Sequence, residues 1–221
     1  VIGLSGGLDS SVCLVLAAKA LSKNMILGLI MPERGVTPQK DIDNAYALAE
    51  KYKIRHKEIH FESAKKILLR NLPTDKLSGG NFSARLRMSL LFHYAGTENL
   101  LVLGTSDKSE IMIGYFTKYG DGAADILPIG ELYKSQVRML GNKLGLSDKI
   151  TNEPSSPRFW KGHLAEKELG LTYDEIDTIL QHSLCGDLDK CVLNKGKIRK
   201  VIQLVRKSSH KREHIPVCNP F

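Results

Sequence analysis

The apolar positions of the chain form short continuous runs that alternate with segments of helical periodicity. Residues 25–31 are a continuous apolar run that ends before Pro32, which is the pattern of a strand covered on both faces. Further along, Ile42, Ala45 and Leu48 recur at the spacing of one helix face. Strands are predicted at residues 1–4, 25–31, 54–61 and 99–105. Strand and helix alternate strictly, which predicts an α/β fold with a doubly wound, Rossmann-like parallel sheet and helices on both faces.

The segments between and after these strands predict helices and three long loops. Helices are expected from Ser11, from Pro38, around 67–69, from near Ser83, and over 132–144, 173–184 and 197–207. Loops are expected over 72–81, 115–125 and 153–161. Long irregular loops in compact domains usually carry function. Ligands of open α/β sheets bind beyond the carboxyl ends of the strands, so residues 5–10 and 105–114 should face one crevice.

The size and composition predict a single domain. The 221 residues are enough for one substantial core, with an α/β part over 1–150 and a loop and helical C-terminal part over 151–221. The hydrophobic content of 42% and the charged content of 25% are ordinary for a soluble protein. No apolar run approaches the roughly 18 residues of a membrane span. We therefore expect a cytoplasmic protein without a membrane partner. Because the chain begins inside a strand without Met, we also expect residues before Val1.

The net charge restricts the expected class of partner only in part, and the cysteine content indicates the compartment. The net charge of +8, concentrated in residues 195–212, suggests an anionic partner. It does not separate a nucleic acid from a dinucleotide, and a solvated basic helix face is the plain alternative. The cysteines, Cys13, Cys185, Cys191 and Cys218, form no Cys-x-x-Cys pair. They are therefore expected to be free thiols in a reducing compartment.

The first ten residues carry the strongest candidate chemistry. Gly6 and Gly7 lie where the first strand turns into a helix, and they allow backbone N–H groups and the helix N-terminus to approach an anion. The Gly-Lys-Ser/Thr of a Walker A loop is absent, and Asp9 lies in the turn instead. A carboxylate beside polyphosphate is repulsive unless a cation lies between them, so Asp9 is a candidate Mg²⁺ ligand. The alternative is a glycine-rich turn with Ser or Asp acting only as a cap.

Two motifs resemble known families. Ser5-Gly6-Gly7-Leu8-Asp9-Ser10 resembles the pyrophosphate loop of the ATP pyrophosphatases, which have an adenine nucleotide alpha hydrolase-like fold and split ATP into AMP and pyrophosphate. Residues 106–110, 114–122, 125, 128–129 and 132–137 together resemble NAD synthetase, in particular its compact ammonia-dependent form. The resemblance runs from Gly3 to Arg212 and so covers essentially the whole chain as one domain, with the ATP-binding core in residues 1–150.

The resemblance implies a reaction and a set of site residues. It implies ATP-dependent amidation of deamido-NAD by ammonia through an acyl-adenylate, giving NAD⁺, AMP and pyrophosphate, in a homodimer. The implied ATP contacts are Gly3, Leu4, Ser5, Gly6, Gly7, Leu8, Asp9, Ser10, Thr105, Lys134 and Ser156. The implied deamido-NAD contacts are Arg85, Lys118, Asp125, His210 and Lys211. Asp9, Glu110, Lys134 and Asp125 are the candidate catalytic residues, and Asp9 and Glu110 the candidate Mg²⁺ ligands. The sequence does not separate Arg85 from Arg87 as the ligand contact.

The sequence departs from the family pattern in one loop. It also leaves two rival functions open. Phe159, His163 and Ala165 replace the usual Leu, Gln and Asp of a loop near Trp160. Another ATP pyrophosphatase, such as a GMP synthetase catalytic unit, is one rival. A non-enzymatic nucleotide- or RNA-binding module is the other. Two carboxylates at a phosphate site favour catalysis, because simple polyanion binding gains nothing from them. We therefore expect small-molecule substrates and no nucleic acid.

Overall fold

A short parallel sheet with helices on both faces organises the first half of the protein. The computed structural model describes residues 1–218, and residues 219–221 lie outside the described part. The strands are β1 (Ile2–Gly3), β2 (Leu27–Ile30) and β3 (Arg55–Glu58). β1 pairs with β2 and β2 with β3, both in parallel. Single parallel bridges from Ile2 to Leu103 and from Leu103 to Ile126 extend the sheet beyond β1.

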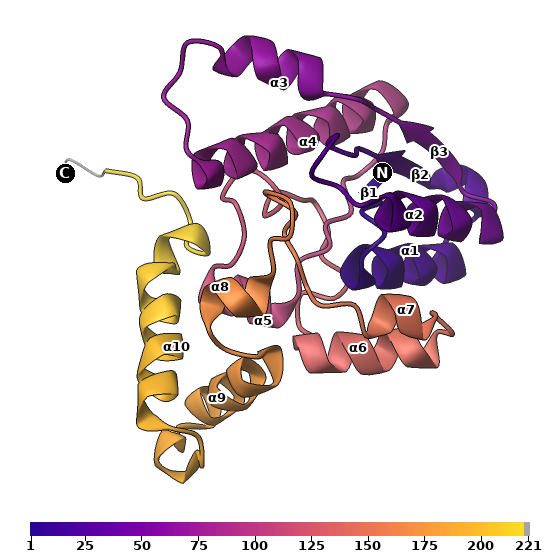
Figure 1. The fold of residues 1–221 in the computed structure, drawn as a ribbon. Coiled ribbons are helices and arrows are strands. Elements are labelled where there is room, and N and C mark those ends of the chain that lie inside the picture. Colours follow the sequence, from indigo (N-terminus) through magenta and orange to yellow (C-terminus); the bar gives the residue numbers. More distant parts are fainter. Residues whose placement is uncertain (219–221) are drawn as a thin grey trace.

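The helices follow the strands and then form a separate cluster at the C-terminal end. The α-helices are α1 (Leu8–Ala20), α2 (Gln39–Lys51), α3 (Glu62–Leu69), α4 (Lys76–Glu98), α5 (Lys108–Ile113), α6 (Lys134–Lys143), α7 (Asp148–Thr151), α8 (Ala165–Leu169), α9 (Tyr173–Cys185) and α10 (Lys195–Lys207). Three 3₁₀ turns lie at η1 (Lys23–Met25), η2 (Leu188–Lys190) and η3 (Ser209–Lys211). α4 lies on one side of the sheet and α1 and α2 on the other (Figure 1). This arrangement confirms the predicted doubly wound α/β fold.

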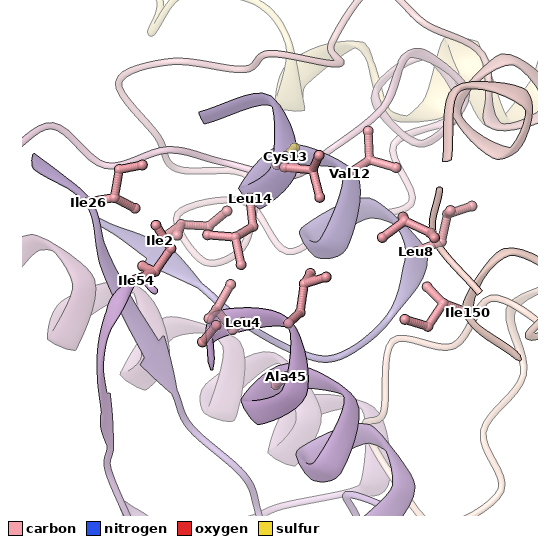
Figure 2. Close-up of a cluster of buried hydrophobic side chains, with 14 of the residues drawn as sticks. Ile2, Leu4, Leu8, Val12, Cys13, Leu14, Ile26, Ala45, Ile54 and Ile150 are labelled. Atoms are coloured by element: carbon pink, nitrogen blue, oxygen red, sulfur yellow. The ribbon is translucent and has the colours of Figure 1, made fainter. Parts of the chain in front are cut away.

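Three hydrophobic clusters correspond to these layers. One lies between β1 and the helices α1, α2 and α6, and it contains Ile2, Leu4 and Leu14 (Figure 2). A second lies on the opposite face of the sheet against α4. The third joins α5, α9 and α10, with Tyr173 and Ile176 fully buried. Because side chains of α5 belong to this third cluster, the helical C-terminal part packs directly on α5, the helix that follows the bridged residue Leu103.

Two of the differences between the predicted and the observed elements have identifiable reasons. Residues 76–81 belong to α4 and not to a loop. The helix begins there because the Asp75 side chain accepts from Ser78 N at 2.8 Å, and Gly80 is helical despite its low propensity. The predicted strand over 99–105 is reduced to the bridges at Leu103, and the Leu101 side chain is 60% exposed. The predicted loops 115–125 and 153–161 are free of helix and strand.

Two further observations bear on the predicted class. Among the described residues no helix combines the length and the hydrophobicity needed to cross a bilayer. The cysteines are all free thiols, Cys13 and Cys191 buried and Cys185 and Cys218 exposed.

Candidate active site

The turn between β1 and α1 is held tightly against α2. Gly6 has a φ of +75°, and a Cβ atom there would lie 1.9 Å from the carbonyl oxygen of Asp41. The Ser5 and Ser10 hydroxyls are 2.9 Å apart, and Gly7 N donates to Ser5 Oγ at 3.3 Å. Gly7 gives α1 no side-chain cap, so the first-turn N–H groups of the helix remain for an anion. This geometry is compatible with the predicted phosphate turn.

Substituting Gly6 should therefore damage the turn more than an ordinary glycine substitution. We expect Gly6→Ala to weaken ATP binding by at least about tenfold, because the added methyl both strains the left-handed backbone and displaces the Asp41 carbonyl. Calorimetric titration with an ATP analogue measures the effect. Gly35→Ala is the matched control, since Gly35 has a φ of +80° but no atom within 4 Å of the added Cβ. Equal binding by the two variants would contradict the proposed role of the close contact.

A buried lysine lies at the centre of three carboxylates next to this turn. Lys134, the first residue of α6, is 1% exposed. Its Nζ lies 2.8 Å from Asp9 Oδ2, 2.7 Å from Asp107 Oδ2 and 2.9 Å from Glu110 Oε1. The same ammonium lies 5.0 Å from the ring centre of Tyr173, whose hydroxyl donates to Glu110 Oε1 at 3.4 Å. One cation thus faces three acidic groups in a site largely closed to water.

Local hydrogen bonds explain why these side chains meet. Asp107 is the N-cap of α5, and its Oδ1 accepts from Glu110 N at 2.8 Å. Ser109 Oγ accepts from Lys134 N at 3.0 Å and donates to Asp177 of α9. Asp177 in turn accepts from Ser135 N at 2.9 Å. The start of α6 is therefore fixed to α5 and α9 by side chains that are themselves buried.

Burial and charge shift the ionisation of this cluster. Burial raises the pKa of Asp107 to about 6 and that of Glu110 to about 8, against the opposing effect of Lys134. Burial alone would lower the pKa of Lys134, but the three carboxylates outweigh it and raise that pKa. Lys134 is therefore charged, and the raised pKa values of Asp107 and Glu110 mean that these two carboxyl groups hold their protons more strongly than exposed ones do.

The donor set fits a divalent cation. One oxygen each of Asp9, Asp107 and Glu110 lie within 4.8 Å of one another. In the described part of the chain Asp9 Oδ1 is buried without a hydrogen-bond partner, and Asp107 Oδ2 has only the ion contact with Lys134. Carboxylate oxygens beside a phosphate site are the ligands that Mg²⁺ prefers, and a bound cation favours the ionised carboxylates.

A cavity of about 270 Å³ opens from the phosphate turn along the carboxyl ends of the strands. The predicted site residues in its wall are Gly3, Leu4, Ser5, Asp9, Ser10, Thr105, Glu110 and Ser156. Gly6, Gly7, Leu8 and Lys134 are not in the wall. Lys134 is buried beneath it, in contact with Asp9 and Glu110. The structure thus brings Thr105 and Ser156 to the same crevice as the residues of the phosphate turn.

Four of the five residues predicted for the dinucleotide form a second group outside the cavity wall, namely Arg85, Lys118, His210 and Lys211. Arg85 Nε donates to Lys118 O at 3.3 Å, and Lys118 Nζ donates to His210 O. Lys211 Nζ donates to the carbonyls of Gly114 and Phe116 at 2.7 and 2.6 Å.

Asp125 and Arg87 lie apart from this basic group. Asp125 Oδ2 accepts from Val102 N at 2.7 Å, so its carboxylate is engaged by the backbone beside β1. Arg87 lines the cavity and donates to Met31 O at 2.9 Å. Of the two arginines left open by the sequence, Arg85 is the one beside Lys118.

Sequence reasoning missed several members of the site. Asp107 lies inside the recognised 106–110 motif but was not assigned a role. Tyr173 and Asp177 come from the helix predicted over 173–184, for which the sequence indicated no role in the site. One signal was present, because Asp177 follows Tyr173 and Ile176 at the i+4 and i+1 positions on the buried face. A carboxylate in an apolar stripe is a candidate for a buried polar contact.

The loop that departs from the family pattern is well packed. The Trp160 and His163 rings stack at 3.6 Å with 11° between their planes, and His163 Nε2 lies 2.7 Å from Glu168 Oε2. The Phe159 ring lies over Gly80, where an added Cβ would be 2.2 Å from Phe159 Cγ. Glycine in α4 is thus required by the close approach of this aromatic side chain.

The parallel sheet, the glycine turn at its first strand and the carboxylate crevice define a nucleotide-binding α/β protein with a pyrophosphate loop. The family model described as NAD synthase matches residues 1–215. The chain belongs to the NAD synthase family.

Individual relatives agree with this assignment. The NH(3)-dependent NAD(+) synthetase of Hyperthermus butylicus is 47% identical over an alignment that covers 100% of this chain and 83% of that protein. Among solved structures, NMN synthetase from Francisella tularensis matches with a TM-score of 0.88, 36% identity and coverage of 100% of this chain and 88% of that one. NH3-dependent NAD synthetase from Campylobacter jejuni matches with a TM-score of 0.84 and 31% identity over 99% and 88% of the two chains.

Proposed function

We propose that the protein is a ligase that amidates deamido-NAD with ammonia, at the expense of ATP, to give NAD⁺, AMP and pyrophosphate. The observation that supports it most is the placement of Asp9, Glu110 and Lys134 at the phosphate end of a cavity, in a member of the NAD synthase family. The nicotinate carboxylate attacks the α-phosphorus of ATP and pyrophosphate departs. Ammonia then attacks the acyl carbon of the adenylate and AMP departs.

The residues of the chain divide this work. The turn at Gly6 and Ser10 binds the polyphosphate through backbone and hydroxyl donors. Lys134 holds a fixed positive charge next to the leaving pyrophosphate, in a site where little water competes with it. Asp9 and Glu110, with Asp107 beside them, would hold Mg²⁺, which supplies positive charge to phosphate oxygens when bound.

The dinucleotide would bind across the basic group formed by Arg85, Lys118, His210 and Lys211. Guanidinium and ammonium groups suit its phosphates and its carboxylate. We further propose that Asp125 contacts a hydroxyl of the substrate or helps to position ammonia. In the described structure its carboxylate accepts from Val102 N, so this role requires that hydrogen bond to be shared or exchanged.

The function is tested by release of AMP and pyrophosphate that depends on both deamido-NAD and ammonia. A second arm replaces deamido-NAD by nicotinate mononucleotide, because a solved structure 36% identical to this chain is an NMN synthetase. Turnover with nicotinate mononucleotide and none with deamido-NAD would show that the mononucleotide is the substrate. ATP cleavage dependent on neither compound would overturn the proposal.

Ammonia and not glutamine should be the nitrogen donor of this chain. Glutamine hydrolysis needs an activated nucleophile with a positioned base. Cys13 and Cys191 are buried, and burial raises the pKa of Cys13, the opposite of what a reactive thiolate requires. We expect NAD⁺ formation with ammonium chloride and none with glutamine in ammonia-free buffer. Sustained glutamine-dependent synthesis by the purified chain would contradict this.

We propose that the active form is a homodimer, as the family resemblance implies, with the second subunit completing the dinucleotide site. Sedimentation velocity at assay concentration should give a single species of about twice the chain mass of 24.5 kDa. An active monomer at that concentration would refute the dimer.

A further inference from the structure

Arg158 has an unusual backbone conformation in the loop that closes one side of the cavity. Its φ is +52°, a left-handed value that non-glycine residues rarely adopt. Arg158 N donates to Ser156 Oγ at 3.2 Å, and both residues line the cavity. Strained backbone of this kind persists where surrounding contacts fix it, and it is concentrated at functional sites.

The Arg158 side chain forms a two-point ion pair with a buried carboxylate. Its Nε lies 2.8 Å from Asp41 Oδ2, and its Nη2 lies 3.2 Å from Asp41 Oδ1. The two side chains are only 19% and 7% exposed. A bidentate guanidinium pair in such a setting is both stronger and more directional than a surface ion pair.

Asp41 links this pair to the phosphate turn. The Asp41 carbonyl is the atom that a Cβ at Gly6 would meet at 1.9 Å, and Asn44 Nδ2 of the same helix donates to Gly6 O at 3.5 Å. The start of α2 is therefore wedged between the phosphate turn and the Arg158 loop. Both of these segments supply wall residues of the same cavity, Ser10 from one and Ser156 from the other.

We propose that Arg158 is a positioning residue whose ion pair with Asp41 fixes the 153–161 loop against the phosphate turn in the arrangement that binds ATP. This inference rests on the proposed function only in taking ATP as the nucleotide. Arg158 acts through Asp41, so the contribution of each residue to ATP binding depends on the presence of the other.

Calorimetric titration of the full chain with a non-hydrolysable ATP analogue and Mg²⁺ tests this coupling. Arg158→Gln and Asp41→Asn should each weaken binding by about tenfold, and the double variant should be no weaker than either single variant. Arg158→Lys should recover only part of the loss, because an ammonium cannot make the two-point contact. Hydrogen exchange of the loop amides should rise in both single variants.

The chain offers a matched control in the same pair of elements. Lys40 of α2 and Glu153 of the loop form an ion pair of 2.7 Å whose lysine is 58% exposed. Lys40→Gln should leave ATP binding within about twofold, because exposed pairs contribute little.

Three results would overturn the inference. Unchanged ATP binding in Arg158→Gln is the first, and additive losses in the double variant are the second. A loss in Arg158→Gln with none in Asp41→Asn is the third, since Arg158 would then act directly on the nucleotide. Should Arg158→Gln fail to fold, Arg158→Lys replaces it. The comparison is then made between Arg158→Lys, the near-isosteric Asp41→Asn and the double variant of these two. ATP binding is measured without NAD⁺ formation, so failure of the proposed function is a separate outcome.

Discussion

The Asp9→Asn variant is expected to lose about a thousandfold in kcat/KM at saturating Mg²⁺. The substitution keeps the shape of the side chain but removes one of the negative charges that would hold the metal. Charge stabilisation by a bound metal is worth several kcal/mol in a transition state, which is the size of this loss. Within residues 1–218 Asp9 forms an ion pair only with Lys134, and its second oxygen is buried without a hydrogen-bond partner. Glu110→Gln should behave alike.

The matched control for both variants is Glu131→Gln. Glu131 pairs with Lys108 at 2.8 Å, but its side chain is 91% exposed and it is not in the cavity wall. Initial rates over a Mg²⁺ titration measure the effect, and the Mg²⁺ dependence of thermal melting gives a second readout that needs no turnover. Near-normal rates of Asp9→Asn and Glu110→Gln would disprove the metal assignment.

Lys134→Met should destabilise the fold as well as abolish activity. The substitution leaves three carboxylates in a closed site without their cation, and removal of one member of a buried ionic group typically costs about 3–5 kcal/mol. For a domain of this size that corresponds to a fall in Tm of roughly 6–20 °C. Differential scanning calorimetry measures it. Added Mg²⁺ should restore more stability to the variant than it adds to the unmodified protein, because the metal replaces the lost positive charge.

Lys190→Met provides the comparison for this variant. Lys190 lies 3.8 Å from Asp187 and its side chain is 73% exposed. Its loss should change the free energy of unfolding by less than about 1 kcal/mol. If Lys134→Met melted within a few degrees of Lys190→Met, the ionic description of the site would be wrong.

The sequence predicted the layout of the fold because apolar runs and helical periodicity are local signals. It failed where tertiary contacts override local preference. Gly79 and Gly80 indicated a loop, yet they lie in α4, where the aromatic ring of Phe159 needs the space that a side chain at Gly80 would fill. Helices as short as α5, α7 and α8 carry too few residues to show a period.

Only the part of the candidate site that lies in motifs at strand ends was predictable from the sequence. Asp9 and Glu110 follow from their positions beyond the sheet, and Lys134 from the family resemblance. The meeting of these three with Asp107 and Tyr173 was not predictable, because it depends on how α5, α6 and α9 pack together. The pair of Arg158 and Asp41 joins residues 117 positions apart, and no sequence pattern indicated it.

The aromatic stack in the loop next to the cavity gives the protein a built-in optical probe. Trp160 is the single tryptophan of the chain, and it lies two residues after Arg158 with its indole against the His163 ring. Indole emission depends on what surrounds the ring, so the tryptophan emission of the unlabelled protein, excited selectively over that of its tyrosines, reports on one position only. Rapid mixing with nucleotide, followed by emission in real time, would give the rate at which this loop responds to a ligand, independently of any coupled assay for the product.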